Sequence, residues 1–115
     1  MLVVDDSSLL LAAVAAVVAL EGYPTIVARD RGEALAQLDL ARPWLVVTAL
    51  QMAPMDGGEL VVALRERMPG LAAVIMAPHP EARRTIEALP AAYLATPFTL
   101  GELLWAIAAA TVGAA

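Results

Sequence analysis

Short apolar runs alternate with longer amphipathic stretches along the whole chain. The apolar runs are residues 1–4, 23–28, 45–49, 72–76 and 93–96. Their length and their content of β-branched residues predict buried strands, and the stretches between them repeat apolar residues at helical spacing. Helices are expected over residues 8–20, after Asp30, after Asp56, over residues 81–89, and from Thr99 to about residue 110. Regular alternation of this kind predicts one doubly wound three-layer α/β domain over residues 1–115, with a parallel sheet between two helical layers.

Three helix starts carry a capping pair, in which a side-chain oxygen accepts a hydrogen bond from a backbone N–H three residues further on. The pairs are Asp30 with Glu33, Asp56 with Glu59, and Thr99 with Glu102. Gly22 is the expected stop of the first helix, because glycine tolerates the left-handed backbone that ends many helices. The predicted helix starts therefore rest on side-chain chemistry as well as on periodicity.

Composition narrows the class of protein. The 115 residues are 61% hydrophobic, a share that argues against a disordered chain. No apolar run approaches the roughly 20 residues of a membrane span, and the chain lacks the basic start of a signal peptide. The absence of cysteine excludes disulfides and thiolate metal sites. The net charge of −5 argues against direct binding to nucleic-acid phosphates.

The chemistry expected at the carboxyl ends of the strands is sparse. Ligands bind at this edge in parallel α/β sheets. Asp5 and Asp6 follow the first strand, and the central run of residues 45–49 ends in Ala49, whose methyl group is inert. His79 is the only histidine and stands between two prolines, where it is either a base or phosphoryl acceptor, or simply a loop residue without a partner.

Several segments, in order and at matching spacing, resemble the receiver domain of two-component response regulators. They are residues 2–6, 22–23, 29–35, 43–57 and 93–98. The resemblance covers essentially the whole chain. It implies a flavodoxin-like fold with five parallel strands in the order 2-1-3-4-5 and about five helices. It also implies a cytoplasmic role in phosphorelay signalling.

The same resemblance implies where phosphoryl chemistry would take place. In this family an aspartate after the third strand accepts a phosphoryl group, an acidic pair holds Mg²⁺, and a Thr or Ser and a Lys contact the phosphoryl oxygens. Here Ala49 stands at the acceptor position, Pro78 at the Thr/Ser position and Thr96 at the Lys position. The chain is therefore expected to be a degenerate receiver, or pseudo-receiver, and not an enzyme.

Two features of the family's site are retained, although the acceptor, the Thr or Ser and the Lys are replaced. Asp5 and Asp6 correspond to the magnesium-binding pair, which without a third carboxylate is expected to bind Mg²⁺ weakly. The other interpretation of the pair is an acidic cap that suits the positive end of the first helix, and no cofactor is then expected. Pro97 corresponds to the family's proline that follows a cis peptide bond, so the bond between Thr96 and Pro97 is expected to be cis.

Trp105 is the preferred functional residue. On the last helix the leucines and Ile107 share one arc, and Trp105 lies roughly opposite. An exposed tryptophan suggests a protein interface, although the ring could instead fold over its own helix or the tail. The family's usual partner surface comprises the fourth helix, fifth strand and fifth helix, which adds Tyr93, Glu102 and Ala109 to the expected interface and favours a homodimer. The alanine face of the first helix is a second candidate surface, which its alanine-rich composition explains equally well.

Three functions follow as hypotheses. The leading one is an interaction or dimerisation module in signal transduction that works without phosphorylation, through a protein partner or a second copy, and binds neither nucleic acid nor membrane. The alternative is a receiver that still accepts phosphate on a non-standard residue, Asp56 or His79. A small-ligand-binding domain of the same fold is the third, and it lacks the glycine-rich phosphate loop after the first strand.

Overall fold

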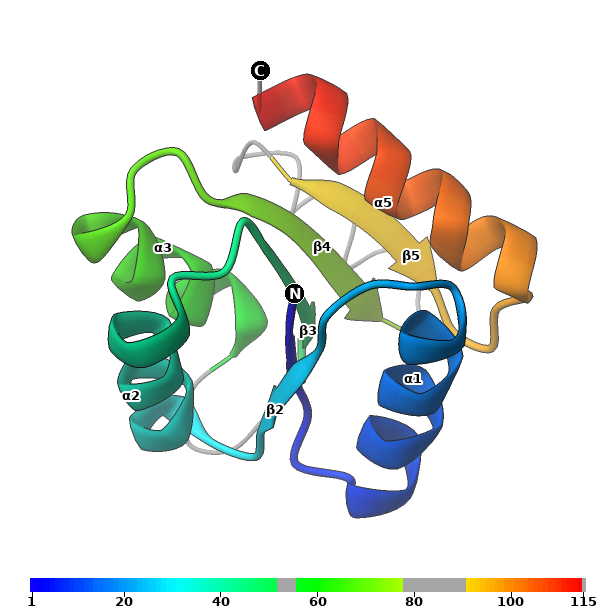
Figure 1. Ribbon diagram of the computed structural model, residues 1–115, viewed down its shortest axis with the longest axis horizontal. Helices are drawn as coiled ribbons and strands as arrows, with labels where there is room; N and C mark the ends of the chain where they lie inside the picture. Colours follow the sequence, from blue (N-terminus) through cyan, green and yellow to red (C-terminus); the bar gives the residue numbers. More distant parts are fainter. Residues whose placement is uncertain (52–55, 78–90, 115) are drawn as a thin grey trace.

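The computed structural model describes residues 1–51, 56–77 and 91–114, apart from the side chains of residues 8–10 and 112–114. The described residues form five strands and four helices (Figure 1). In chain order these are β1 (Leu2–Val4), α1 (Ser8–Leu20), β2 (Ile26–Ala28), α2 (Arg31–Ala41), β3 (Leu45–Ala49), α3 (Gly57–Arg67), β4 (Ala72–Ala77), β5 (Ala92–Ala95) and α5 (Leu100–Ala114). The short helix expected over residues 81–89 lies outside the described residues, so the expected count of about five helices is reduced to four here.

The strands form one parallel sheet in the order β2-β1-β3-β4-β5, which confirms the predicted order. Helices α1 and α5 cover one face of the sheet, and α2 and α3 cover the other (Figure 1). The central strands are buried throughout because both faces are covered, as their continuous apolar runs predicted. This three-layer arrangement brings the carboxyl ends of β1, β3, β4 and β5 to a common edge.

The local signals in the sequence account for the helix ends. Asp30 and Asp56 are N-caps, and each Oδ1 accepts a hydrogen bond of 2.8 Å from the backbone N–H three residues on. Thr99 and Glu102 form a reciprocal capping box, in which both bonds measure 3.1 Å. Gly22 has φ of +89°, a conformation that glycine adopts without strain, and it is the second residue after the end of α1.

Two elements have bounds that differ from the predicted ones by more than one residue. Strand β2 is three residues long rather than six, because Pro24 has no N–H to donate to a neighbouring strand. In the segment before β2, the Thr25 hydroxyl donates to the Tyr23 carbonyl at 2.8 Å, and the Met1 amine donates to the Pro24 carbonyl at 2.6 Å. Helix α5 continues to Ala114 rather than ending near residue 110. Alanine is the strongest helix former, and the Thr111 hydroxyl is satisfied by the Ile107 carbonyl at 2.8 Å, so nothing stops the helix earlier. Among the described residues, none of the helices is long and apolar enough to cross a membrane.

Candidate functional site

The carboxyl ends of β1 and β3 lie side by side and present the first candidate residues. The parallel register pairs Val4 with Thr48. Asp5 and Ala49 are the next residues on the two strands, so they lie at the same level of the sheet edge. Asp6 follows and is exposed. A carboxyl group and a methyl group therefore face the crevice in which a parallel sheet binds its ligands.

Asp5 is a buried carboxyl group, with 3% of its surface exposed. Its Oδ1 accepts a hydrogen bond from the Ser7 backbone N–H at 2.8 Å, whereas its Oδ2 has no hydrogen-bond partner among the described residues. Burial raises the pKa of Asp5 above its ordinary value; the Ser7 bond opposes this rise and the charge of Asp6 adds to it. Asp5 consequently holds a proton more tightly than an aspartate in water.

Helix α3 begins tightly against the end of β3. The Gly57 N–H donates to the Leu50 carbonyl at 2.6 Å, and a Cβ at Gly57 would overlap the Ala49 carbonyl oxygen. Glycine is therefore required where α3 begins against the end of β3. The Ala49 side chain is itself buried, and it offers no nucleophile, base or ligand atom.

Apart from Asp5 and Asp6, three oxygen-bearing side chains on the described segments next to this edge are candidate substitutes for an acceptor. The buried Thr48 hydroxyl donates to the Ala49 carbonyl at 3.0 Å. Asp56 caps α3 through the Glu59 N–H at 2.8 Å. Thr96 is half-buried, its N–H donates to the Ala77 carbonyl at 3.1 Å, and its peptide bond to Pro97 is cis.

Metal-binding chemistry is equally sparse at this edge. No cluster of three or more His, Cys, Asp or Glu side chains that could hold a metal ion occurs within residues 1–51, 56–77 and 91–114. Pro78 and His79, two further candidates from the sequence, lie outside the described residues. In its described part, the edge brings together Asp5, Asp6 and Ala49, and Ala49 contributes no reactive group.

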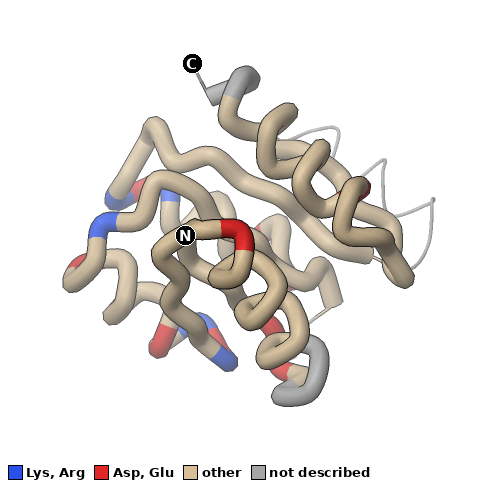
Figure 2. The backbone as a smooth tube through the Cα atoms, turned by 45° about the vertical axis from the view of Figure 1, so that its right-hand side comes forward, with Lys and Arg blue, Asp and Glu red and all other residues tan. Residues whose placement is uncertain are grey.

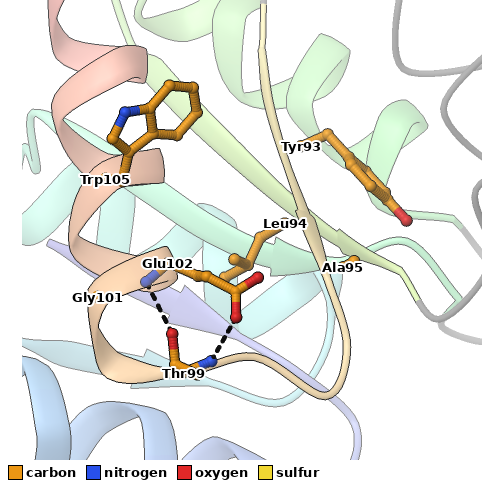
Figure 3. A pocket seen from close by; sticks show the side chains of 7 residues that line it. All are labelled: Tyr93, Leu94, Ala95, Thr99, Gly101, Glu102 and Trp105. Carbon is orange, nitrogen blue, oxygen red and sulfur yellow. Dashed lines mark hydrogen bonds between the residues drawn. The ribbon is translucent and has the colours of Figure 1, made fainter.

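The second candidate site is a shallow hollow of about 500 Å³ between β5 and the first turns of α5 (Figure 3). Its lining comprises Tyr93, Leu94, Ala95, Thr99, Gly101, Glu102 and Trp105. Trp105 is 71% exposed, as the helical arc predicted. The capping box holds the Glu102 carboxylate against Thr99, which fixes its position at the floor of the hollow.

The hollow brings together three of the four residues expected at an interface. Trp105 and Glu102 stand on one side of β5, whereas the Tyr93 ring points away from Trp105 in Figure 3 and its hydroxyl donates to the Ala77 carbonyl at 3.2 Å. Ala109 is half-buried and does not line the hollow. An exposed indole beside a fixed carboxylate and small side chains can receive an apolar group from a partner.

Sequence reasoning missed a second exposed aromatic. Trp44 is 42% exposed and packs against Tyr23, with ring centroids 6.1 Å apart. These rings stand at the opposite end of the sheet, ahead of β3 and β2 respectively. The signal that could have found Trp44 is its place after Pro43, between a helix and a buried strand, where connecting loops run over the surface.

Comparison with known proteins places this architecture among signalling proteins. Residues 1–108 match the family described as "Response regulator receiver domain". The chain is 32% identical over 106 residues to the transcriptional regulatory protein PrrA of Mycobacterium tuberculosis, covering 90% of this chain and 46% of PrrA. It therefore spans about half the length of that relative.

Solved structures agree with the sequence comparison. The chemotaxis protein CheY4 of Vibrio cholerae has 28% identity and a TM-score of 0.85, and the match covers 93% of both chains. NtrX of Brucella abortus, solved in complex with ATP, has 25% identity and a TM-score of 0.87, and the match covers 98% of this chain and 27% of NtrX.

Proposed function

The chain belongs to the response regulator receiver domain family of two-component signalling, and on that premise we propose that it passes signals through protein surfaces and is not phosphorylated. Receiver domains are signalling domains rather than typical enzymes. The proposal concerns how this particular receiver works, and it includes the cytoplasmic location implied by the resemblance.

The observation that carries the proposal is Ala49 at the end of β3, level with Asp5. The family's phosphoacceptor is an aspartate at this position, and a methyl group cannot form an acyl phosphate. The nearest substitutes are engaged elsewhere: the Thr48 hydroxyl is buried and bonded, and Asp56 caps α3. The lysine that would neutralise a phosphoryl group is replaced by Thr96, so charge stabilisation is lost together with the acceptor.

The proposed function does not require bound Mg²⁺. The unpartnered Oδ2 of Asp5 is a suitable oxygen ligand, but Oδ1 already accepts from the Ser7 N–H. Mg²⁺ prefers an octahedral shell of carboxylates, phosphate and water. With Ala49 in place of the third carboxylate, the described residues do not complete such a site, and we expect only weak binding through Asp5 and Asp6.

The surface around Trp105 is the proposed contact. It combines a largely exposed indole with the hollow beside β5. Aromatic side chains seated in small hollows dominate the binding energy of many interfaces. A second copy of the chain is the proposed first partner, bound through the face formed by β5 and α5; a foreign protein bound there would serve the same function. Nucleic acid is disfavoured by the net charge of −5.

The test of the phosphorylation claim is incubation with acetyl phosphate and Mg²⁺, followed by intact-protein mass spectrometry. The expected spectrum is unchanged. A stable mass increase of one phosphoryl group would overturn the proposal and favour the alternative acceptors Asp56 or His79. The receiver of a phosphorylatable regulator, treated in parallel, shows that the phosphodonor is active.

The test of the contact surface is sedimentation equilibrium of the wild type and Trp105→Glu. The variant places a charge where the indole is 71% exposed, so we expect weaker self-association with an unchanged fold. Trp44→Glu is the matched control, because it alters the other exposed tryptophan at the far end of the sheet. A wild type that is monomeric at high concentration would overturn the homodimer, and the Trp105 surface would then be tested against foreign partners.

A further inference from the structure

The hollow beside Trp105 carries a negative charge next to an aromatic ring. Glu102 is the one carboxylate among the residues that line it, and none of them is lysine or arginine. Glu102 is exposed and precedes Trp105 by three residues on α5, so the two side chains lie one turn apart on the same side of the helix. Figure 3 shows both of them on the same side of β5. An incoming group therefore meets the carboxylate and the indole together.

The capping box leaves the Glu102 carboxylate both fixed and available. Its Oε1 accepts the Thr99 backbone N–H at 3.1 Å, whereas its Oε2 makes no hydrogen bond within the described residues and points away from Thr99 in Figure 3. A side chain that is already held in one conformation loses less entropy when it binds a partner. Ala95 and Gly101, which also line the hollow, are too small to fill it. The Oε2 atom is thus ready for a donor that enters the hollow.

The chemistry of these two groups selects a cation. An apolar group seated on Glu102 would remove the carboxylate from water without replacing its hydrogen bonds, and an anion would be repelled. A guanidinium group stacks its flat face on an indole while its N–H groups donate to a carboxylate, and its aliphatic stem packs against apolar surface. A lysine ammonium is a more strongly hydrated point charge and does not stack in this way. An arginine side chain therefore fits the hollow best.

The described arginines of this chain all lie in or beside α2 and α3, which cover the other face of the sheet. They are Arg29, Arg31, Arg42, Arg65 and Arg67. In Figure 2 the basic positions gather on the side of α2 and α3, whereas the single charged position on α5 is acidic. Two copies that met through β5 and α5 would bring two acidic faces together and supply no described arginine. We propose that the Trp105 hollow binds an arginine side chain of a different protein, held between the indole of Trp105 and the carboxylate of Glu102.

This inference rests on the proposed function, in the form in which a foreign protein occupies the Trp105 surface, and it names the chemistry of that contact. A second copy bound through the same face would cover the hollow, so the two occupants compete. The arginine supplies the selectivity of the contact rather than most of its strength, because a single exposed ion pair is weak in water. The remaining affinity comes from the surface around the hollow.

The test is an NMR titration of the ¹⁵N-labelled chain with the capped tripeptide Ala-Arg-Ala, at a concentration at which sedimentation shows a monomer. The chain has two tryptophans and hence two indole N–H signals, which Trp105→Phe assigns, and Trp44 at the other end of the sheet is an internal control. We expect a saturable shift of the Trp105 signal, an unchanged Trp44 signal, and a dissociation constant on the order of a millimolar. The same peptide with citrulline in place of arginine has nearly the same shape without the charge, and it is expected to bind about tenfold more weakly.

Glu102→Gln tests the part of the carboxylate. Glutamine keeps an Oε1 acceptor for the Thr99 N–H, so the capping box is retained, and the affinity for the arginine peptide should fall about tenfold. Glu33→Gln is the matched control, because Glu33 accepts the Arg29 N–H at 2.9 Å in the capping pair of α2 and lies far from the hollow. It should bind the peptide as the wild type does. Circular dichroism checks that each variant folds.

Four results would overturn this inference. A Trp105 signal that does not move at tens of millimolar peptide, or equal affinity for the arginine and citrulline peptides, would show that the hollow does not select a cation. Unchanged binding by Glu102→Gln would remove the carboxylate from the contact. Weaker self-association of Glu102→Gln in sedimentation equilibrium would make a second copy the source of the arginine. None of these results changes the outcome of the acetyl phosphate or Trp105→Glu experiments, so failure here is distinguishable from failure of the proposed function.

Discussion

Replacing Asp5 with asparagine tests whether the buried Asp5 carboxyl group lowers the stability of the folded protein. The Asp5 side chain is 3% exposed, and its Oδ2 lacks a partner among the described residues. Asparagine has nearly the same shape and keeps an Oδ1 acceptor for the Ser7 N–H, which Asp5 binds at 2.8 Å. The substitution therefore removes the charge and leaves the turn into α1 in place. We expect Asp5→Asn to be more stable than the wild type at neutral pH.

The size of the gain follows from the cost of an unpaired buried polar group, which is about 1–3 kcal/mol and larger for a charged one. The new amide leaves its own Nδ2 donor unsatisfied, so only part of that cost is recovered. We expect the free energy of unfolding to rise by about 1–2 kcal/mol. For a domain of this size, 1 kcal/mol shifts Tm by about 4 °C, so Tm should rise by about 4–8 °C.

The stability advantage of Asp5→Asn over the wild type is expected to increase with pH. The pKa of folded Asp5 is raised, whereas the unfolded chain titrates near the ordinary value of 3.8. Below that value both states are protonated and Asp5 contributes nothing. As pH rises above it, the unfolded chain loses its proton first, so the free energy of unfolding of the wild type falls until the folded pKa is passed. The advantage of Asp5→Asn should therefore appear above about pH 4 and then level off.

Urea denaturation followed by circular dichroism between pH 3 and pH 8 measures this difference directly. Asp6→Asn is the control: Asp6 is exposed, and its removal should give a smaller gain because its charge is a lesser cause of the raised Asp5 pKa. Loss of stability in Asp5→Asn at neutral pH, or a gain that does not change with pH, would refute the reasoning. The first result would mean that the folded protein stabilises the ionised carboxylate, and the second would mean that the gain does not come from the charge of Asp5.

Three further substitutions test the packing, the capping and the lost metal site. Gly57→Ala should lower the free energy of unfolding by about 3 kcal/mol, because the new Cβ overlaps the Ala49 carbonyl. The control Gly70→Ala should have little effect, because the space around Gly70 is open. Equal losses of stability in urea denaturation would contradict this prediction. Thr99→Ala should lower stability by about 1 kcal/mol through loss of the 3.1 Å capping bond, measured by thermal melting, and an unchanged Tm would show that the capping box is dispensable. Ala49→Asp should be less stable than the wild type without Mg²⁺, and its Tm should rise more than that of the wild type when millimolar Mg²⁺ is added. An equal rise in Tm for the wild type and the variant would show that a third carboxylate does not complete a magnesium site.

The sequence was a good guide to the layers because periodicity and capping chemistry are local. Val14 and Val18 are buried at the spacing that predicted a helical core stripe, and Asp30 caps α2 as its spacing indicated. Strand β2 was predicted too long because β-branched and aromatic residues at 23–25 look like strand in isolation. The Met1 amine binds the Pro24 carbonyl, a contact across 23 residues of sequence, and no local pattern contains it.

The positions of the candidate residues could be predicted from the sequence, whereas their surroundings could not. Spacing after the first and third strands put Asp5 and Ala49 at one edge. The burial of Asp5 depends on β2, because the Asp5 N–H donates to the carbonyl of Ala28, the last residue of that strand, at 3.2 Å. The exposure of Trp105 followed from the helical arc, whereas the hollow beside it depends on how α5 packs against β5.

Two features support the proposed function. Within the part of the sheet edge that the structure describes, β3 ends in Ala49, whose methyl group is not a nucleophile, and burial raises the pKa of the neighbouring Asp5. The most exposed aromatic side chain among the described residues, Trp105, lies elsewhere, on α5 beside β5. Under the proposed function, a partner that binds at Trp105 would carry the signal, and no covalent change at the sheet edge would be needed.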